Sequence, residues 1–272
     1  MVIRVGTSGW SYDHWHPELY PPGLPVRDRL ARYAAAFGTA ELNSSFYHWP
    51  RPAAFRSWRH RLPDGFLLSV KAPRGLTHAR KLYAPETWLP RIEAGWHELG
   101  EKRAVLLVQL PPSQPRDDAR LAYFLGLVPG CLRVAVEFRH HSWHREEIFA
   151  LLDEHRAAYC VVLPGCRSRL NFAILRRRSY GADLPCVLRA TADFVYVRMH
   201  GPDHHQLYAG SYPDADLRWW ADRLREWAQS GHDVFVYFND GDANAVRNAR
   251  TLQGLLRSGG ASLPATSMLN SS

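Results

Sequence analysis

Four side chains able to exchange protons stand far apart in the sequence, each at or near the end of a short apolar run: Glu41, Lys71, Glu137 and His200. Paired carboxylates in a site of mixed charge can have their pKa values pushed apart, which suits acid–base catalysis. A lysine among cations can lose its proton and act as a base or Schiff-base nucleophile, whereas one beside a carboxylate stays charged and binds anions. Histidine transfers protons near neutral pH. We therefore take these four residues as the candidate catalytic set.

The elements that must position this set are eight short runs rich in β-branched residues. Several are continuously apolar, as expected for parallel strands covered on both faces. The predicted strands are Val2–Ser8, Ala40–Ser45, Phe66–Ala72, Ala104–Leu110, Leu132–Arg139, Ala158–Leu163, Phe194–His200 and Val234–Asn239.

The stretches between the strands show the helical period instead. Apolar residues repeat at i, i+3, i+4 and i+7 from Leu30 to Phe37 and from Leu217 to Trp227, and a similar stripe runs from Ala245 to Leu256. We expect Asp214 and Asp242 to cap the last two helices. Eight βα alternations predict an α/β fold, a single-domain (β/α)₈ (TIM) barrel over residues 1–258, with a flexible tail over 259–272.

Barrel geometry predicts where the reactive side chains lie. Reactive groups stand at the C-terminal ends of barrel strands, and side chains alternate inward and outward along each strand. The parity places Glu41, Asn43 and Ser45 on one face of the second strand. In the same way, one mouth is expected to gather Lys71, Gln109, Glu137, Arg139, Arg198, His200 and Asn239.

Two interpretations of this mixed-charge mouth remain open. Glu41–Lys71 and Glu137–Arg198 could be structural ion pairs that plug the barrel, because buried charges are costly unless paired. We favour a functional site, because a plug does not need so many charged groups at the strand ends alone. Whether Glu41 or the two arginines dominate the surroundings of Lys71 decides whether Lys71 stays charged.

Aromatic residues flank the expected mouth and could stack on a base or sugar ring. They are Trp10, Tyr12, Trp15, Tyr47, Trp143, Tyr208 and Tyr212. The loop from Asp240 to Asn244 opens the last helix, whose N-terminus could hold a phosphate. Because Asp240 and Asp242 would repel an anion, simple capping is an equal alternative.

Composition favours a globular cytoplasmic protein. The chain has 272 residues, 46% of them hydrophobic, and we find no apolar run long enough to span a membrane and no signal segment. Its four cysteines show no ligand spacing, so we expect reduced thiols and no metal or cofactor. The net charge is +8, and five arginines lie between Arg167 and Arg178, which allows contact with a polyanion.

Seven colinear motifs resemble the domain-of-unknown-function 72 family, also called YecE-like. They are GTSGWSYDHW, ELNSSFYHWP, FLLSVKAPRGLTH, VLLVQLPPS, VAVEFRHHSW, FVYVRMHG and YFNDGDANAVRNA, which together run from about Val2 to Leu256. The resemblance implies a TIM barrel with no assigned activity. It also implies a mouth lined by Thr7, Trp10, Glu41, Asn43, Lys71, Arg74, His78, Gln109, Glu137, Arg139, His200, Asn239 and Asp242. The segment Cys166–Arg178 is not part of the family pattern.

These observations favour an enzyme of hydrolase, lyase or isomerase type that acts on a small phosphate- or carboxylate-bearing substrate. Lys71, Arg139 and Arg198 would hold the anion. The alternative is a nucleic-acid-binding or nuclease-like protein with a fold similar to that of endonuclease IV, suggested by the net positive charge. Metal catalysis is disfavoured because three cations stand among the potential ligands. A binding module without turnover, and the oligomeric state, stay open.

Overall fold

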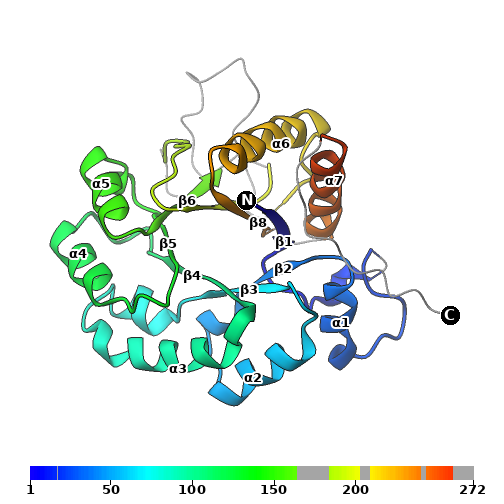
Figure 1. Cartoon of the computed structure of the whole chain (residues 1–272), viewed down its shortest axis with the longest axis horizontal. Coiled ribbons are helices and arrows are strands. Elements are labelled where there is room, and N and C mark those ends of the chain that lie inside the picture. Colours follow the sequence, from blue (N-terminus) through cyan, green and yellow to red (C-terminus); the bar gives the residue numbers. More distant parts are fainter. Residues whose placement is uncertain (17, 164–183, 203–208, 240–242, 260–272) are drawn as a thin grey trace.

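A computed structural model describes residues 1–16, 18–163, 184–202, 209–239 and 243–259. Eight parallel strands form one sheet in which the second to eighth strands are hydrogen-bonded to one another in chain order, and the first strand pairs with the eighth. The strands are β1 (Ile3–Thr7), β2 (Thr39–Leu42), β3 (Leu67–Lys71), β4 (Arg103–Gln109), β5 (Val134–Glu137), β6 (Ala158–Leu163), β7 (Phe194–Met199) and β8 (Asp233–Phe238). All eight predicted strands are confirmed, and the sheet curls into a barrel (Figure 1).

The barrel closes between β1 and β2. Ser8 forms an isolated parallel bridge with Glu41, and the Gly9 amide donates to the Glu41 carbonyl oxygen at 2.7 Å. At Gly6 the two strands approach so closely that a Cβ atom would lie 2.2 Å from the Thr39 carbonyl oxygen. A glycine in β1 is therefore required for this closure.

Seven α-helices of the described residues surround the sheet (Figure 1). They are α1 (Arg29–Ala34), α2 (Pro52–Arg61), α3 (Leu89–Leu99), α4 (Asp118–Leu127), α5 (Glu146–Glu154), α6 (Asp214–Gln229) and α7 (Asn244–Ser258). The predicted stripe of α7 is buried along its whole length, and α6 buries Leu217, Trp220 and Leu224. Phe37 is buried but lies beyond the end of α1.

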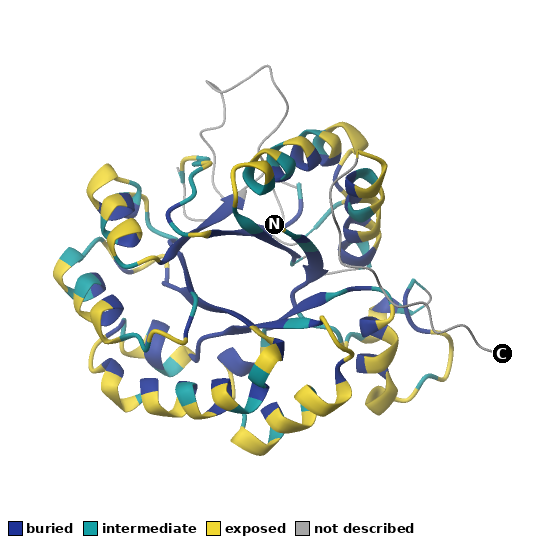
Figure 2. Ribbon diagram, viewed as in Figure 1, coloured by how far each residue is buried: buried dark blue, intermediate teal, exposed yellow. Residues whose placement is uncertain are grey.

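The alternation of side chains divides the apolar core into two parts. Outward-facing strand residues and the buried helix faces form a ring-shaped outer core, and the ribbon coloured by burial shows dark blue turned toward the sheet (Figure 2). Inward-facing residues form a smaller cluster that fills the barrel, including Leu107, Cys160, Phe194, Tyr196 and Phe235. The barrel interior is therefore packed, as in other barrels of this type, and not an open pore.

A layer of hydroxyl groups tops this inner cluster. The Tyr237 hydroxyl lies 2.7 Å from the Thr39 hydroxyl and 2.9 Å from that of Ser69. Tyr196, whose ring lies 5.1 Å from that of Tyr237, directs its own hydroxyl to Glu41. The polar residues at the C-terminal strand ends thus rest on a closed, hydrogen-bonded floor.

Two local predictions are wrong. Asp214 is the first residue of α6, with Pro213 at the cap position, so its side chain makes no cap hydrogen bond. Ser45 does not continue the second strand, because a 3₁₀ turn (Ser44–Phe46) follows β2 and turns its hydroxyl toward the Leu42 and Lys71 carbonyl oxygens.

Other predictions fall outside the described residues. These are the tail beyond residue 259, the arginine-rich segment from Arg167 to Arg178, and the capping residue Asp242. Within the described residues, no helix combines the length and apolar character that crossing a membrane would require.

Candidate functional site

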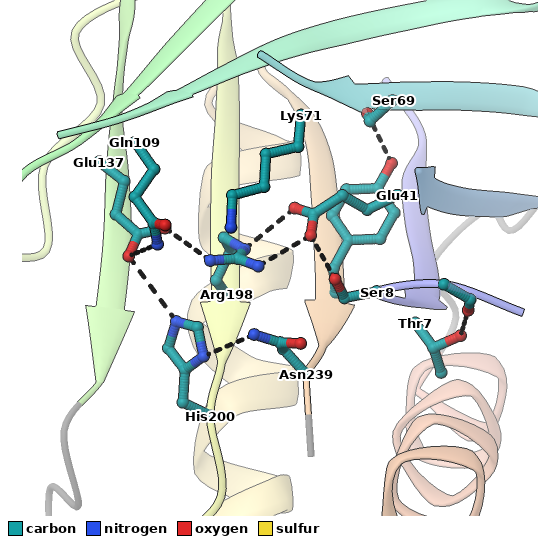
Figure 3. Close-up of polar contacts among 12 residues, drawn as sticks. Thr7, Ser8, Glu41, Ser69, Lys71, Gln109, Glu137, Arg198, His200 and Asn239 are labelled. Atoms are coloured by element: carbon teal, nitrogen blue, oxygen red, sulfur yellow. Dashed lines mark hydrogen bonds and ion pairs between the residues drawn. The ribbon is translucent and has the colours of Figure 1, made fainter. Parts of the chain in front are cut away.

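A single arginine joins the two predicted glutamates at the C-terminal mouth of the barrel (Figure 3). The Arg198 guanidinium on β7 donates two hydrogen bonds to the Glu41 carboxylate, at 2.8 and 3.0 Å. Its remaining terminal nitrogen donates to Glu137 on β5 at 2.7 Å. All three side chains are fully buried. Charges this deep persist only when paired and hydrogen-bonded, a condition the planar guanidinium satisfies on both sides.

The Glu41 carboxylate accepts two further hydrogen bonds. Ser8 donates from the end of β1 at 2.5 Å, and the Tyr196 hydroxyl donates from below at 2.7 Å. Each carboxylate oxygen thus has one bond from Arg198 and one from a hydroxyl group. Both oxygens of Glu41 are therefore already satisfied by protein partners.

Glu137 is held in a similar way. One carboxylate oxygen accepts from Gln109 at the end of β4, at 2.8 Å, and from the Arg139 guanidinium. Burial by itself would raise the pKa of Glu137, but Arg139 and Arg198 outweigh it and lower that pKa well below the ordinary value. Glu137 is therefore a carboxylate throughout the neutral range, and it is poorly suited to accept a proton there.

His200 directly follows β7 and lies between Glu137 and Asn239 (Figure 3). The Asn239 amide nitrogen is 3.1 Å from Nδ1, and Nε2 is 3.9 Å from the nearer Glu137 oxygen. Since an amide NH₂ only donates, Nδ1 is the acceptor and the ring proton resides on Nε2. Burial, Arg198 and Arg139 lower the pKa of His200 well below its ordinary value, so the imidazole is neutral.

Lys71 is the last residue of β3 and lies beside the Arg198–carboxylate group. The residue is only 8% exposed. Its Nζ lies 4.4 Å from the centre of the Phe46 ring, and among the described residues it has neither a hydrogen bond nor an ion pair. Burial first, and Arg198 next, lower the pKa of Lys71 to about 7, against the opposing influence of Glu137 and Glu41. Lys71 is thus a buried amine that changes its charge near neutral pH.

The remaining predicted residues fall into two groups. Asn43 and His78 are half-buried at the rim, where the His78 ring lies edge-on, 4.8 Å from Phe46, and where burial and Lys71 lower the pKa of His78 to about 4. Tyr47 and Arg74 are exposed beyond them.

Thr7 and Trp10 are turned to other parts of the fold. The Thr7 hydroxyl bonds Tyr33 of α1, at 2.9 Å, and the Gly9 carbonyl oxygen, so Thr7 faces outward from the barrel (Figure 3). Trp10 packs edge-on against Trp58 of α2 at 6.0 Å. Tyr208 and Asp242 lie outside the described residues.

The ion-pair interpretation is confirmed for Glu137–Arg198 and wrong for Glu41, which pairs with Arg198 and not with Lys71. A divalent metal would need carboxylate oxygens that Arg198, Arg139, Ser8 and Tyr196 already occupy, so these glutamates do not fit a metal centre.

Sequence reasoning missed two contributors to the mouth, Ser8 and Phe46. The period-two rule puts Ser8 on an inward face, so parity carried its signal, whereas Phe46 comes from the 3₁₀ turn and has no such pattern. Elsewhere, Glu93, His97 and Cys131 bring one potential ligand atom each within 4.8 Å of one another. They lie where α3 ends and β5 is about to begin, at the opposite end of the barrel.

Fold and site together define a (β/α)₈-barrel protein with a buried carboxylate–arginine–carboxylate group at its C-terminal mouth. The chain belongs to the family described as protein of unknown function DUF72, which matches residues 4–269.

Solved structures of the family share the architecture. A DUF72 family protein from Thermotoga maritima is 26% identical, with a TM-score of 0.78 over 94% of this chain and 100% of that one. One from Enterococcus faecalis is 18% identical, with a TM-score of 0.70 over 94% and 98%. The UPF0759 protein YecE of Escherichia coli (strain K12) is 28% identical over 140 residues, 51% of this chain. The match covers 49% of this curated relative, so the chain spans about half of its length.

Proposed function

We propose that this chain is an enzyme that binds a small phosphate- or carboxylate-bearing substrate at the C-terminal mouth and acts on it by acid–base chemistry. The observation that carries the proposal is Lys71, a nearly buried amine without a carboxylate partner among the described residues, set beside two arginines. Perturbed titrating groups at the C-terminal strand ends of a barrel are typical of catalytic sites.

The charges of the mouth favour an anion. Among the described residues, Arg139, Arg198 and Lys71 face the two carboxylates, so one positive charge is in excess when Lys71 is protonated. Because Arg198 is fully buried and doubly paired, Lys71 and the half-buried Arg139 are the cations placed to meet a ligand.

Proton transfer is assigned to Lys71, and His200 assists as a hydrogen-bond donor. Lys71 exchanges a proton near pH 7, and neutral His200 presents its Nε2–H on the side of Glu137. Glu41 and Glu137 act in this scheme by fixing Arg198, Arg139 and the ring of His200. Preorganised charges of this kind stabilise charge that develops during a reaction.

Sulfate binding at different pH values tests the proposal, because sulfate itself does not titrate in the neutral range. An anion prefers protonated Lys71, so affinity should be highest below pH 7 and should fall by up to about tenfold per pH unit above it. Calorimetric titration at pH 6, 7, 8 and 9 measures this. Lys71→Arg should bind tightly at every pH, and Lys71→Gln weakly at every pH.

Arg103→Gln is the matched control, because it removes one charge from an exposed position at the opposite end of β4. It should leave the pH profile unchanged. A flat profile in the parent protein, or equal weakening by both glutamine variants, would contradict the proposal. A thermal-shift screen of phosphorylated and carboxylated metabolites then narrows the substrate, since a ligand at ~100 times its Kd stabilises the fold by about 2.7 kcal/mol.

A further inference from the structure

Lys71 differs from the other buried lysine of the chain in what its amine contacts. Lys102 is 2% exposed, and its Nζ donates to the Pro63 carbonyl oxygen at 2.8 Å and lies 3.2 Å from an Asp64 carboxylate oxygen. Among the described residues, Lys71 has only the face of Phe46 at this range. A lysine kept for structure is given oxygen partners, as Lys102 is, whereas Lys71 is buried without them.

The carboxylates nearest to Lys71 do not form an ion pair with its amine, because other groups already bond their oxygens. Both Glu41 oxygens carry two hydrogen bonds, and Glu137 is bonded by Arg198, Gln109 and Arg139. Glu41, Glu137, Arg198, Arg139, His200 and His78 are the charged or titratable groups that influence Lys71 or are influenced by it. The carboxylates thus pair with Arg198 and Arg139, and the amine of Lys71 faces the ring of Phe46.

We propose that Lys71 forms an imine with the carbonyl carbon of an anionic aldehyde or ketone substrate. This inference rests on the proposed function, since it names the substrate class of the same site. A desolvated lysine close to other cations is the arrangement by which amines become nucleophiles in proteins.

The step balances with the groups present. The lone pair of neutral Nζ attacks the carbonyl carbon, and the C=O electron pair moves to oxygen, which takes up a proton. The nitrogen then releases a proton, its lone pair forms the C=N bond, and the oxygen leaves as water after a second protonation. His200, with its proton on Nε2, is positioned in the same mouth to donate a hydrogen bond to the departing oxygen, and solvent supplies the second proton. The protonated imine draws electrons from a neighbouring C–H or C–C bond of the substrate.

The charge of the mouth suits this product. The protonated imine places a positive charge where protonated Lys71 had one, close to the two fixed carboxylates, so no new uncompensated charge is created. Because the pKa of Lys71 is lowered to about 7, about half of the Lys71 side chains carry a neutral amine at pH 7. For an ordinary lysine, the neutral fraction at that pH is roughly one in 2,500.

Reductive trapping tests the inference, because the chain has only three lysines. The full-length protein is incubated at pH 7 with pyruvate or glyoxylate and cyanoborohydride, which reduces an iminium to a stable secondary amine, and the lysine peptides are quantified by mass spectrometry. We expect adducts on Lys71 to form at least about 50-fold faster than on half-exposed Lys81, because the lowered pKa of Lys71 makes its free amine available at neutral pH. The Lys71 rate should level off above pH 7 to 8.

A Lys71 rate no higher than that of Lys81, or one without a plateau, would overturn the inference. Lactate, an anion of the same size without the carbonyl group, separates this failure from that of the proposed function. If sulfate and lactate bind with the expected pH profile but pyruvate leaves no adduct on Lys71, the imine is wrong and the anion site stands. Lys71→Arg should keep lactate binding and lose all trapping at this position.

Discussion

Arg198 decides how the charged groups at the mouth pair. Because it donates hydrogen bonds to both glutamates, it occupies their carboxylate oxygens and leaves Lys71 without an ion-pair partner among the described residues. The sequence places Glu41, Lys71, Glu137, Arg139 and Arg198 on inward faces but gives no indication of how they pair. Pairing is therefore the reason why the proposed proton transfer is assigned to the amine of Lys71 and not to the two carboxylates.

Removing one carboxylate should reveal the cost of the buried arginine. In Glu41→Gln, Arg198 keeps only Glu137 as a charged partner, so we expect the free energy of unfolding to fall by about 3–5 kcal/mol, as for other broken buried ion pairs. Urea unfolding at pH 7 measures the change. The exposed pair Arg56–Glu98 offers a matched control, and Glu98→Gln should cost less than about 1 kcal/mol. Equal effects would mean that the buried group contributes no more than a surface pair.

At the scale of elements, barrel closure depends on the approach of β1 to β2. This junction has the bridge between Ser8 and Glu41 in place of a continuous ladder, and Gly6 lies against the backbone of Thr39. The same closure delivers the Ser8 hydroxyl to the Glu41 carboxylate. Strand geometry and site geometry are coupled at this point.

Gly6→Ala should therefore destabilise the fold by at least about 2 kcal/mol, because backbone atoms cannot move aside as a flexible side chain can. Gly254→Ala is the control, since Gly254 sits in α7 with nothing within 4 Å of an added Cβ. It should raise stability by about 0.5–1 kcal/mol through helix propensity. Thermal unfolding of both variants measures the difference, and a neutral Gly6→Ala would show that the β1–β2 contact is loose.

At the scale of the whole molecule, the net charge of +8 concerns long-range attraction more than the chemistry of the mouth. Five of the arginines, at positions 167, 169, 176, 177 and 178, lie in a part of the sequence outside the described residues. Charge of this kind attracts polyanions without base selectivity, and the attraction weakens steeply with salt.

We expect a short DNA duplex to bind weakly at low salt and to be released between about 50 and 200 mM salt, with a log–log slope near −0.9 per phosphate contact. Changing these five arginines to glutamine lowers the net charge to +3 and should flatten the slope, whereas Lys71→Gln should leave it unchanged. Fluorescence anisotropy at several salt concentrations measures both. Loss of duplex binding in Lys71→Gln alone would instead favour a nucleic-acid function of the mouth.

Much of the fold and part of the site could be predicted from the sequence. Apolar runs and helical stripes are local properties, so they gave all eight strands, and period-two parity placed Glu41, Lys71, Glu137 and Arg198 on inward faces. Local patterns were less reliable at element ends. The predictions for Ser45 and Asp214 were wrong because a turn or a helix begins one or two residues from its expected position.

Tertiary structure alone decided the partners. Which inward side chains meet depends on the tilt and stagger of strands around the closed barrel, and these follow from pairing across the whole sheet. They bring Arg198 between two glutamates from β2 and β5, send Thr7 outward to Tyr33, and set Lys71 against Phe46. The sequence by itself determined that acids and bases converge at one mouth; the closed barrel decided which of them pair with one another, because only neighbours in space can neutralise a buried charge.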